Sequence, residues 1–251
     1  MDVVGDLLAR ERRSRNPALV TRNDSERSYR DVITNAYKAA NVLRHLGARE
    51  GATVAVAPEP EFHTALAFLG AARLGARVRF DPGPGLRAGD RVVLTAVADE
   101  ADADPSPGTN LAVFGGKPTR PETTHWEAQL WSENPGTPPS DVDPADAVLV
   151  CGDATVSHGD ALDAARGIGE TFGLDASSRV VVRTTFSDPG SVVAGLLAPL
   201  LCGGATVLAG SERPAEGTAA RGDLAVVPDS DAGGPSTVPE PRRTAPPNLS
   251  E

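Results

Sequence analysis

The feature that most constrains the fold is a regular alternation between amphipathic segments and short apolar runs. Residues 28–46 repeat apolar side chains at helical spacing, which predicts a helix with one buried face. Residues 53–57 then predict a buried strand, residues 61–74 a second helix and residues 77–80 a second strand. Strands that alternate with helices favour parallel pairing through right-handed crossovers. We therefore predict an α/β fold with a mostly parallel, doubly wound sheet.

The alternation continues toward the C-terminus, but composition divides the chain. Further strands are predicted over residues 91–97, 111–114, 147–151, 179–184 and 205–208, and further helices over 157–172 and 191–201. We predict a first α/β subdomain over 1–118, an irregular Pro-rich connection over 119–145, a second α/β subdomain over 146–228 and a disordered tail over 229–251. The tail is assigned as disordered because it is rich in proline and nearly without large apolar side chains.

The charge of the chain excludes several classes of partner. It holds 34 acidic and 24 basic residues, for a net charge of -10, and only Lys38 and Lys117 are lysines. General nucleic-acid binding requires a basic surface, so we expect none. No apolar run approaches the roughly 18 residues of a membrane span, and the N-terminus has no signal-peptide pattern, so we expect no membrane association and a cytoplasmic location. Excess acid with scarce lysine also indicates a halophilic source.

One turn has the position that a phosphate-binding loop takes in such folds, between the strand 147–151 and the helix that begins near Ser157. Phosphate loops use glycines for close backbone approach, hydroxyls as extra donors and a lysine for charge. This turn keeps one glycine, has no lysine, and places Asp153 where it would repel a phosphate. The candidate binding residues at this degenerate loop are Cys151, Gly152, Asp153, Thr155, Ser157 and His158.

His158 and the two cysteines of the chain each have more than one interpretation. His158 is either a residue that lines a ligand cleft or a helix-start or surface histidine. Cys151 and Cys202 lie in apolar runs, which favours buried free thiols over a zinc site. Ser157, His158 and Asp160 do not indicate a hydrolase triad, because the sequence has no G-x-S-x-G elbow.

Two stretches of the sequence resemble a known superfamily. The first stretch comprises Asn16–Val20, Ser28–Val32, Leu43–Gly47, Gly51–Val56, Pro60–Phe62, Leu74–Ala76 and Asp81–Pro82. The second comprises Pro144–Ala147, Val156–His158 and Ala198–Ala205. In order and spacing they resemble the N-terminal part of the AMP-forming acyl-CoA synthetases, which include acyl- and aryl-CoA ligases, luciferases and peptide-synthetase adenylation domains. The resemblance covers roughly residues 3–209 and implies the fold of the first part of the large domain.

The departures from that family bear on activity. Where the family carries a loop like TSGTTG-x-PKG, this chain has only Cys151–Thr155, shorter by about ten residues. Phe186–Pro189 replaces the aromatic–histidine pair that the family often has near its acyl pocket, and the later adenine, ribose and catalytic-lysine segments of the family are not found in the 251 residues. The resemblance therefore implies the fold without the reaction.

Three hypotheses for function follow. The favoured one is a catalytically inactive binding or regulatory module with no assigned cofactor. The alternative is an AMP-forming acyl-activating ligase subunit completed in trans by a partner chain, with ATP and AMP as its nucleotides. The third is a decaying remnant. An open half-domain exposes apolar surface, so we expect a protein partner or a homodimer.

Overall fold

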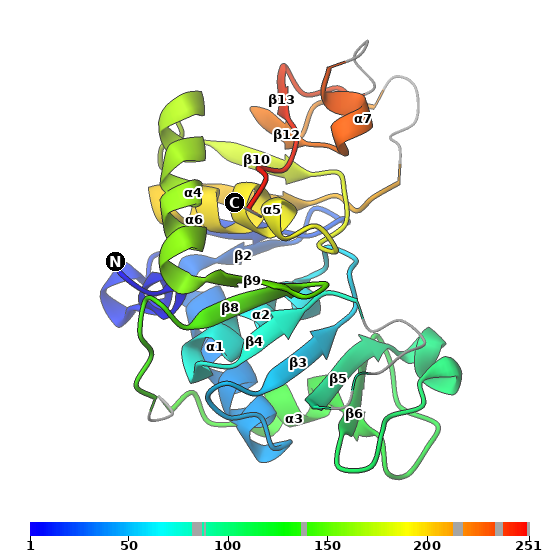
Figure 1. Ribbon diagram of the computed structural model, residues 1–251. Helices are drawn as coiled ribbons and strands as arrows, with labels where there is room; N and C mark the ends of the chain where they lie inside the picture. The colour runs from blue at the N-terminus through cyan, green and yellow to red at the C-terminus, as the bar shows by residue number, and fades with distance from the viewer. Residues whose placement is uncertain (82–86, 88, 137–139, 213–217, 234–237, 250–251) are drawn as a thin grey trace.

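The strands form two sheets, both mostly parallel, in a mixed α/β architecture (Figure 1). The computed structural model describes residues 1–81, 87, 89–136, 140–212, 218–233 and 238–249. One sheet has the order β13-β12-β10-β11-β1-β2 and the other has the order β7-β6-β5-β3-β4-β8-β9. Within the described residues, only the pairs β1–β2 and β8–β9 are antiparallel. The predicted fold class is confirmed, with two sheets in place of the single one expected.

The strands of the first sheet come from both ends of the chain. They are β1 (Pro17–Val20), β2 (Glu26–Ser28), β10 (Arg179–Val182), β11 (Ala205–Leu208), β12 (Leu224–Val226) and β13 (Arg242–Thr244). Those of the second sheet are β3 (Thr53–Val56), β4 (Arg77–Arg79), β5 (Asp90–Ala96), β6 (Asn110–Phe114), β7 (Thr124–His125), β8 (Ala147–Cys151) and β9 (Ala154–Ser157). The sheets thus cross the subdomain boundaries predicted at 118 and 146. One continuous hydrophobic core includes buried residues of both, such as Leu19, Val54 and Val182.

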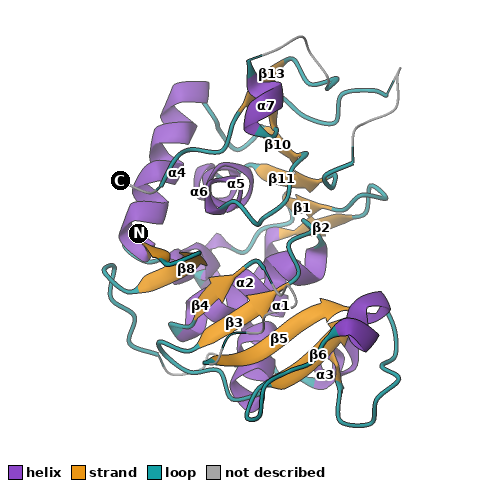
Figure 2. Cartoon of the chain, turned by 45° about the vertical axis from the view of Figure 1, so that its right-hand side comes forward, coloured by secondary structure: helices purple, strands orange, loops and turns teal. Residues whose placement is uncertain are grey.

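Figure 2 shows the helices in purple, packed beside the strands in orange. They are α1 (Tyr29–His45), α2 (Phe62–Leu74), α3 (Trp126–Ser132), α4 (His158–Phe172), α5 (Pro189–Val192), α6 (Ala198–Cys202) and α7 (Asp229–Ala232). Shorter helical segments are η1 (Val4–Leu8), η2 (Arg10–Arg12), η3 (Val97–Asp102) and the π-helical η4 (Val193–Leu197). In Figure 1, α1 and α2 lie behind the sheet that contains β3 and β4.

Helices α1 and α2 pack closely against each other. Ser28 caps α1, with its hydroxyl accepting from the Asp31 amide at 3.2 Å. Gly70 lets α2 approach α1, because a Cβ at this position would lie 2.7 Å from the Ala40 nitrogen. Small side chains therefore set the spacing between α1 and α2, and with it the position of the adjacent strands.

The tail differs from the predicted disorder over residues 238–249. Strand β13 pairs with β12 in parallel, and buried Glu240 forms a two-point ion pair with Arg183 at 2.7 Å. Disorder was predicted because the tail has few large apolar side chains. The segment is instead held by backbone hydrogen bonds to β12 and by this buried ion pair. Residues 234–237 and 250–251 lie outside the described residues.

The connection over 119–145 is less irregular than predicted, because it contains β7 and α3. Its two tryptophans differ completely in environment. Trp126 is fully buried at the start of α3, whereas the Trp131 side chain is 90% exposed. Only the first of them fixes this segment to the core.

Candidate functional site

The predicted phosphate turn is a tight β-hairpin in the structure. Cys151 of β8 pairs with Ala154 of β9, which leaves Gly152 and Asp153 as the turn, with Gly152 at φ 61°. Glycine with positive φ at the first central position is typical of two-residue hairpin turns. The prediction of a direct strand-to-helix turn is wrong, because residues 154–157 form an additional antiparallel strand before α4. The four-residue run was too short to show its alternation.

The candidate residues at this turn face solvent. Cys151, Gly152, Asp153 and Thr155 are all exposed, so the prediction of a buried Cys151 thiol is wrong. Arg87 donates a hydrogen bond from Nη1 to the Gly152 carbonyl oxygen at 2.7 Å. The nearby cation therefore binds a backbone acceptor, and the turn itself presents the carboxylate of Asp153. Cys202 is half-buried, and burial raises the pKa of its thiol.

The other two candidates begin helix α4. The Ser157 hydroxyl accepts from the Asp160 amide at 3.1 Å and caps the helix. His158 is fully buried, and its Nδ1 accepts a hydrogen bond from the Val4 amide at 3.1 Å. Burial lowers the pKa of His158 to about 4, while the carboxylates of Asp146 and Asp6 act in the opposite direction. This environment agrees with the interpretation of His158 as a helix-start histidine. Its side chain links the N-terminal segment to α4 through the hydrogen bond from Val4.

The six candidates therefore separate into an exposed turn and a helix start, where Ser157 is half-buried and His158 is fully buried. Among the described residues, no group of three or more His, Cys, Asp or Glu side chains is arranged to hold a metal ion. In the same part of the chain, no helix has the length and apolar character needed to cross a membrane.

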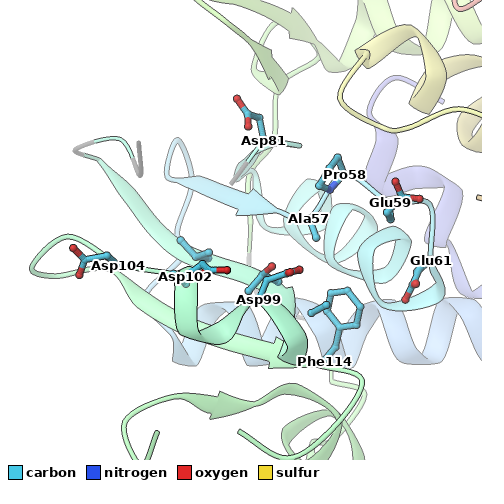
Figure 3. Close-up of a pocket in the computed structure, with 13 residues that line it drawn as sticks. Ala57, Pro58, Glu59, Glu61, Asp81, Asp99, Asp102, Asp104 and Phe114 are labelled. Atoms are coloured by element: carbon cyan, nitrogen blue, oxygen red, sulfur yellow. The ribbon is translucent and has the colours of Figure 1, made fainter. Parts of the chain in front are cut away.

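A cavity of about 490 Å³ lies at another place along the same sheet edge. It is formed where β3, β5 and β6 end, and by the segments that follow them (Figure 3). Its lining residues are Ala57, Pro58, Glu59, Glu61, Asp81, Val93, Thr95, Ala96, Asp99, Asp102, Ala103, Asp104 and Phe114. The carboxyl ends of parallel strands are the usual location of ligand sites in α/β folds.

Sequence reasoning missed this cavity, although a signal was present. Glu59 follows β3 and Asp99 follows β5, so acidic residues come shortly after two strands. Recognising a site there requires the strand order, which places β3, β5 and β6 side by side. In Figure 3, Phe114 lies between Asp99 and Glu61.

A second cavity of about 370 Å³ lies between the starts of α1 and α2 and helix α3. Exposed Trp131 lines it, together with Phe62 and His63. Burial lowers the pKa of His63, whereas the Glu127 carboxylate opposes this shift. The His63 Nε2 atom lies 3.8 Å from a Glu127 oxygen.

Comparison with solved structures defines the class of the fold. The chain has the fold of the N-terminal part of the adenylate-forming ligases. It is similar to the anthranilate CoA ligase AuaEII in complex with anthranoyl-AMP, with 18% identity and a TM-score of 0.73 over 89% of this chain and 49% of that one. No family model and no curated protein matches the sequence.

Two further structures give the same result. A fatty acyl-CoA synthetase of Mycobacterium tuberculosis is 20% identical, with a TM-score of 0.65 over 82% of this chain and 44% of that one. The nonribosomal peptide synthetase FmoA3, in its α-methyl-L-serine-AMP bound form, is 21% identical, with a TM-score of 0.67 over 82% and 23%. This chain spans half or less of each of these three proteins. At such identities the likeness shows the fold alone.

Proposed function

We propose that this chain is a catalytically inactive, adenylate-forming-ligase-like module with a binding or regulatory role. The observation that carries the proposal is the hairpin at Cys151–Ala154, which closes in two residues. Such a turn offers few amides to a triphosphate and no lysine, and the exposed carboxylate of Asp153 opposes an anion. No nucleotide cofactor is assigned under this proposal.

Calorimetric titration of the full chain with ATP–Mg²⁺ and with AMP tests it. We expect no binding of ATP at micromolar concentrations and no ATP–pyrophosphate exchange with a panel of carboxylic acids. An intact acyl-CoA ligase, titrated in the same buffer, serves as the positive control. Micromolar ATP affinity would overturn the proposal.

The alternative is an AMP-forming acyl-activating ligase subunit completed in trans. It is supported by retention of the ligase fold over most of the chain and by the exposed Trp131 side chain, a type of residue that often anchors protein interfaces. Under this alternative, the partner has to supply the phosphate-binding groups that the hairpin lacks. It predicts that a tagged chain, recovered from its source cells, carries a partner and ATP–pyrophosphate exchange activity, both of which Trp131→Ala weakens.

A protein partner or a homodimer belongs to both versions of the proposal. Light scattering in molar salt distinguishes a homodimer or a complex from an isolated monomer. The exposed Trp131 is the first position to substitute in a search for the interface. The cytoplasmic location and the halophilic source inferred from composition stay predictions.

A further inference from the structure

The cavity at the ends of β3, β5 and β6 is negatively charged around an apolar floor. Its acidic lining residues are Glu59, Glu61, Asp81, Asp99, Asp102 and Asp104, and no Lys, Arg or His is among the described residues that line it. The floor includes the buried side chains of Ala57, Val93 and Phe114. An apolar floor beneath an acidic rim suits a ligand with an apolar body and a positive charge.

The charge at the rim is only partly balanced by the protein. Glu59 accepts hydrogen bonds from the Ser211 hydroxyl at 2.9 and 3.2 Å, and an Asp81 oxygen lies 3.9 Å from Arg79 Nη1. In contrast, Glu61, Asp99 and Asp102 form no ion pair with any described residue. Figure 3 shows Glu61 on the segment entering α2, and Asp99 and Asp102 on η3 across the cavity from it.

A mostly buried threonine presents its hydroxyl to this cavity. Thr95 lies on β5 two residues after Val93, so both side chains point to the same face of the sheet and both line the cavity. The Thr95 residue is only 6% exposed, and its hydroxyl makes no hydrogen bond with the described residues. The hydroxyl oxygen itself reaches the cavity, so it is available to a polar group of a ligand.

We propose that this cavity binds a small organic monocation, an amine on an aromatic or aliphatic body. The ammonium group would lie between the carboxylates of Asp99 and Glu61, and the Thr95 hydroxyl would accept one of its hydrogen bonds. The body of the ligand would pack on Val93 and on the ring of Phe114, which also attracts cations. A volume of about 490 Å³ lies within the range of small-molecule sites.

A metal ion fits these residues less well than an amine. The described carboxylates do not come together in a group of three that a metal ion requires. The apolar side chains of the floor have no atoms that coordinate a metal ion, whereas they stabilise the body of an organic cation. The site also shares no residue with the hairpin at 151–154, so the inference does not depend on whether a nucleotide binds.

Calorimetry on the full chain with benzylamine tests the proposal, with benzyl alcohol as a neutral ligand of nearly equal shape. Benzylamine is expected to bind at one site per chain, and benzyl alcohol at least about tenfold more weakly, because only the amine forms charge-assisted hydrogen bonds with the carboxylates. Added salt is expected to weaken benzylamine binding, since the rim carboxylates are exposed. Equal binding of the two compounds, or saturation of the same site by Mg²⁺ alone, would overturn the proposal.

Two variants locate the binding. The double change Asp99→Asn with Asp102→Asn is expected to weaken benzylamine about fivefold to tenfold, and Thr95→Val about threefold. The matched control, Glu122→Gln with Glu170→Gln, removes the same charge at exposed positions outside the cavity and is expected to leave affinity within about twofold. Equal weakening by the two double variants would show a general charge effect and would overturn the site.

Discussion

The two ends of one sheet edge differ in what they present to solvent. Strands β3, β5, β6 and β8 run parallel, so their carboxyl ends share an edge. At the β8 end, a two-residue hairpin places Cys151 and Asp153 in solvent. At the β3–β5–β6 end, the strands lead into a cavity with a buried floor. Topology supplies the edge to both, but the residues that follow each strand decide whether a cavity forms there.

The difference also predicts how each end responds to substitution. The floor of the cavity belongs to the packed core, whereas the hairpin turn is exposed and is held by its own backbone and by one hydrogen bond from Arg87 to the Gly152 carbonyl oxygen. Substitutions in the floor should therefore cost folding free energy, and substitutions in the turn should cost little more than backbone strain. Three measurements test this contrast.

The largest effect is expected for Phe114→Ala. Phe114 is 4% exposed and its ring lies 5.7 Å from the His63 ring. Truncation of a buried phenylalanine costs about 3 kcal/mol or more of unfolding free energy. Urea denaturation measures it, with Thr155→Ala on exposed β9 as the control, expected within about 0.5 kcal/mol of the wild type. Similar losses in both variants would remove the contrast between the two ends.

Local sequence pattern is sufficient for elements whose stabilising contacts are close in the chain. The helical spacing after Ser28 predicts α1 closely, and the apolar run at 147–151 predicts β8 as observed. The same pattern does not show that β1 pairs with β11, because Leu19 and Thr206 are far apart in sequence. That long-range pairing is why two sheets form where one was predicted.

The candidate site was predicted less well than the fold, for a related reason. The resemblance favoured residues 151–158, and that region holds an exposed turn followed by a helix start with a buried histidine. The acidic cavity depends on three strand ends that are adjacent only in the folded sheet. Likewise, Glu240 in a proline-rich tail gave no local sign that it would pair with buried Arg183.

An intermediate effect is expected from His158, where the chain passes from the exposed hairpin into the core. Because burial lowers the pKa of His158 from 6.5 to about 4, the unfolded state binds a proton more readily between these values. Stability from the neutral histidine is therefore full above pH 6.5 and is lost as pH falls toward 4. Between pH 7 and pH 5 the loss should be about 2 kcal/mol.

Denaturation of the wild type and of His158→Gln across this pH range measures the loss. His158→Gln removes the titrating imidazole. The difference in unfolding free energy between the two proteins should therefore change by about 2 kcal/mol between pH 7 and pH 5. Thr155→Ala, at an exposed position without a titratable group, serves as the control and should leave the pH dependence of the wild type unchanged. A His158 pKa above 6 by NMR would show an accessible side chain, and would return His158 to the list of ligand-site candidates.

The smallest effect is expected for Gly152→Ala in the hairpin turn. Gly152 has a φ of 61°, and a Cβ at this position would meet no atom within 4 Å. The cost is therefore backbone strain alone, about 1 kcal/mol by urea denaturation, and Asp153→Asn should change stability by less than about 0.5 kcal/mol. A loss above about 3 kcal/mol in Gly152→Ala would exceed what strain at one residue explains. The turn would then have to support other parts of the molecule, and the contrast between a permissive hairpin and a constrained cavity floor would fail.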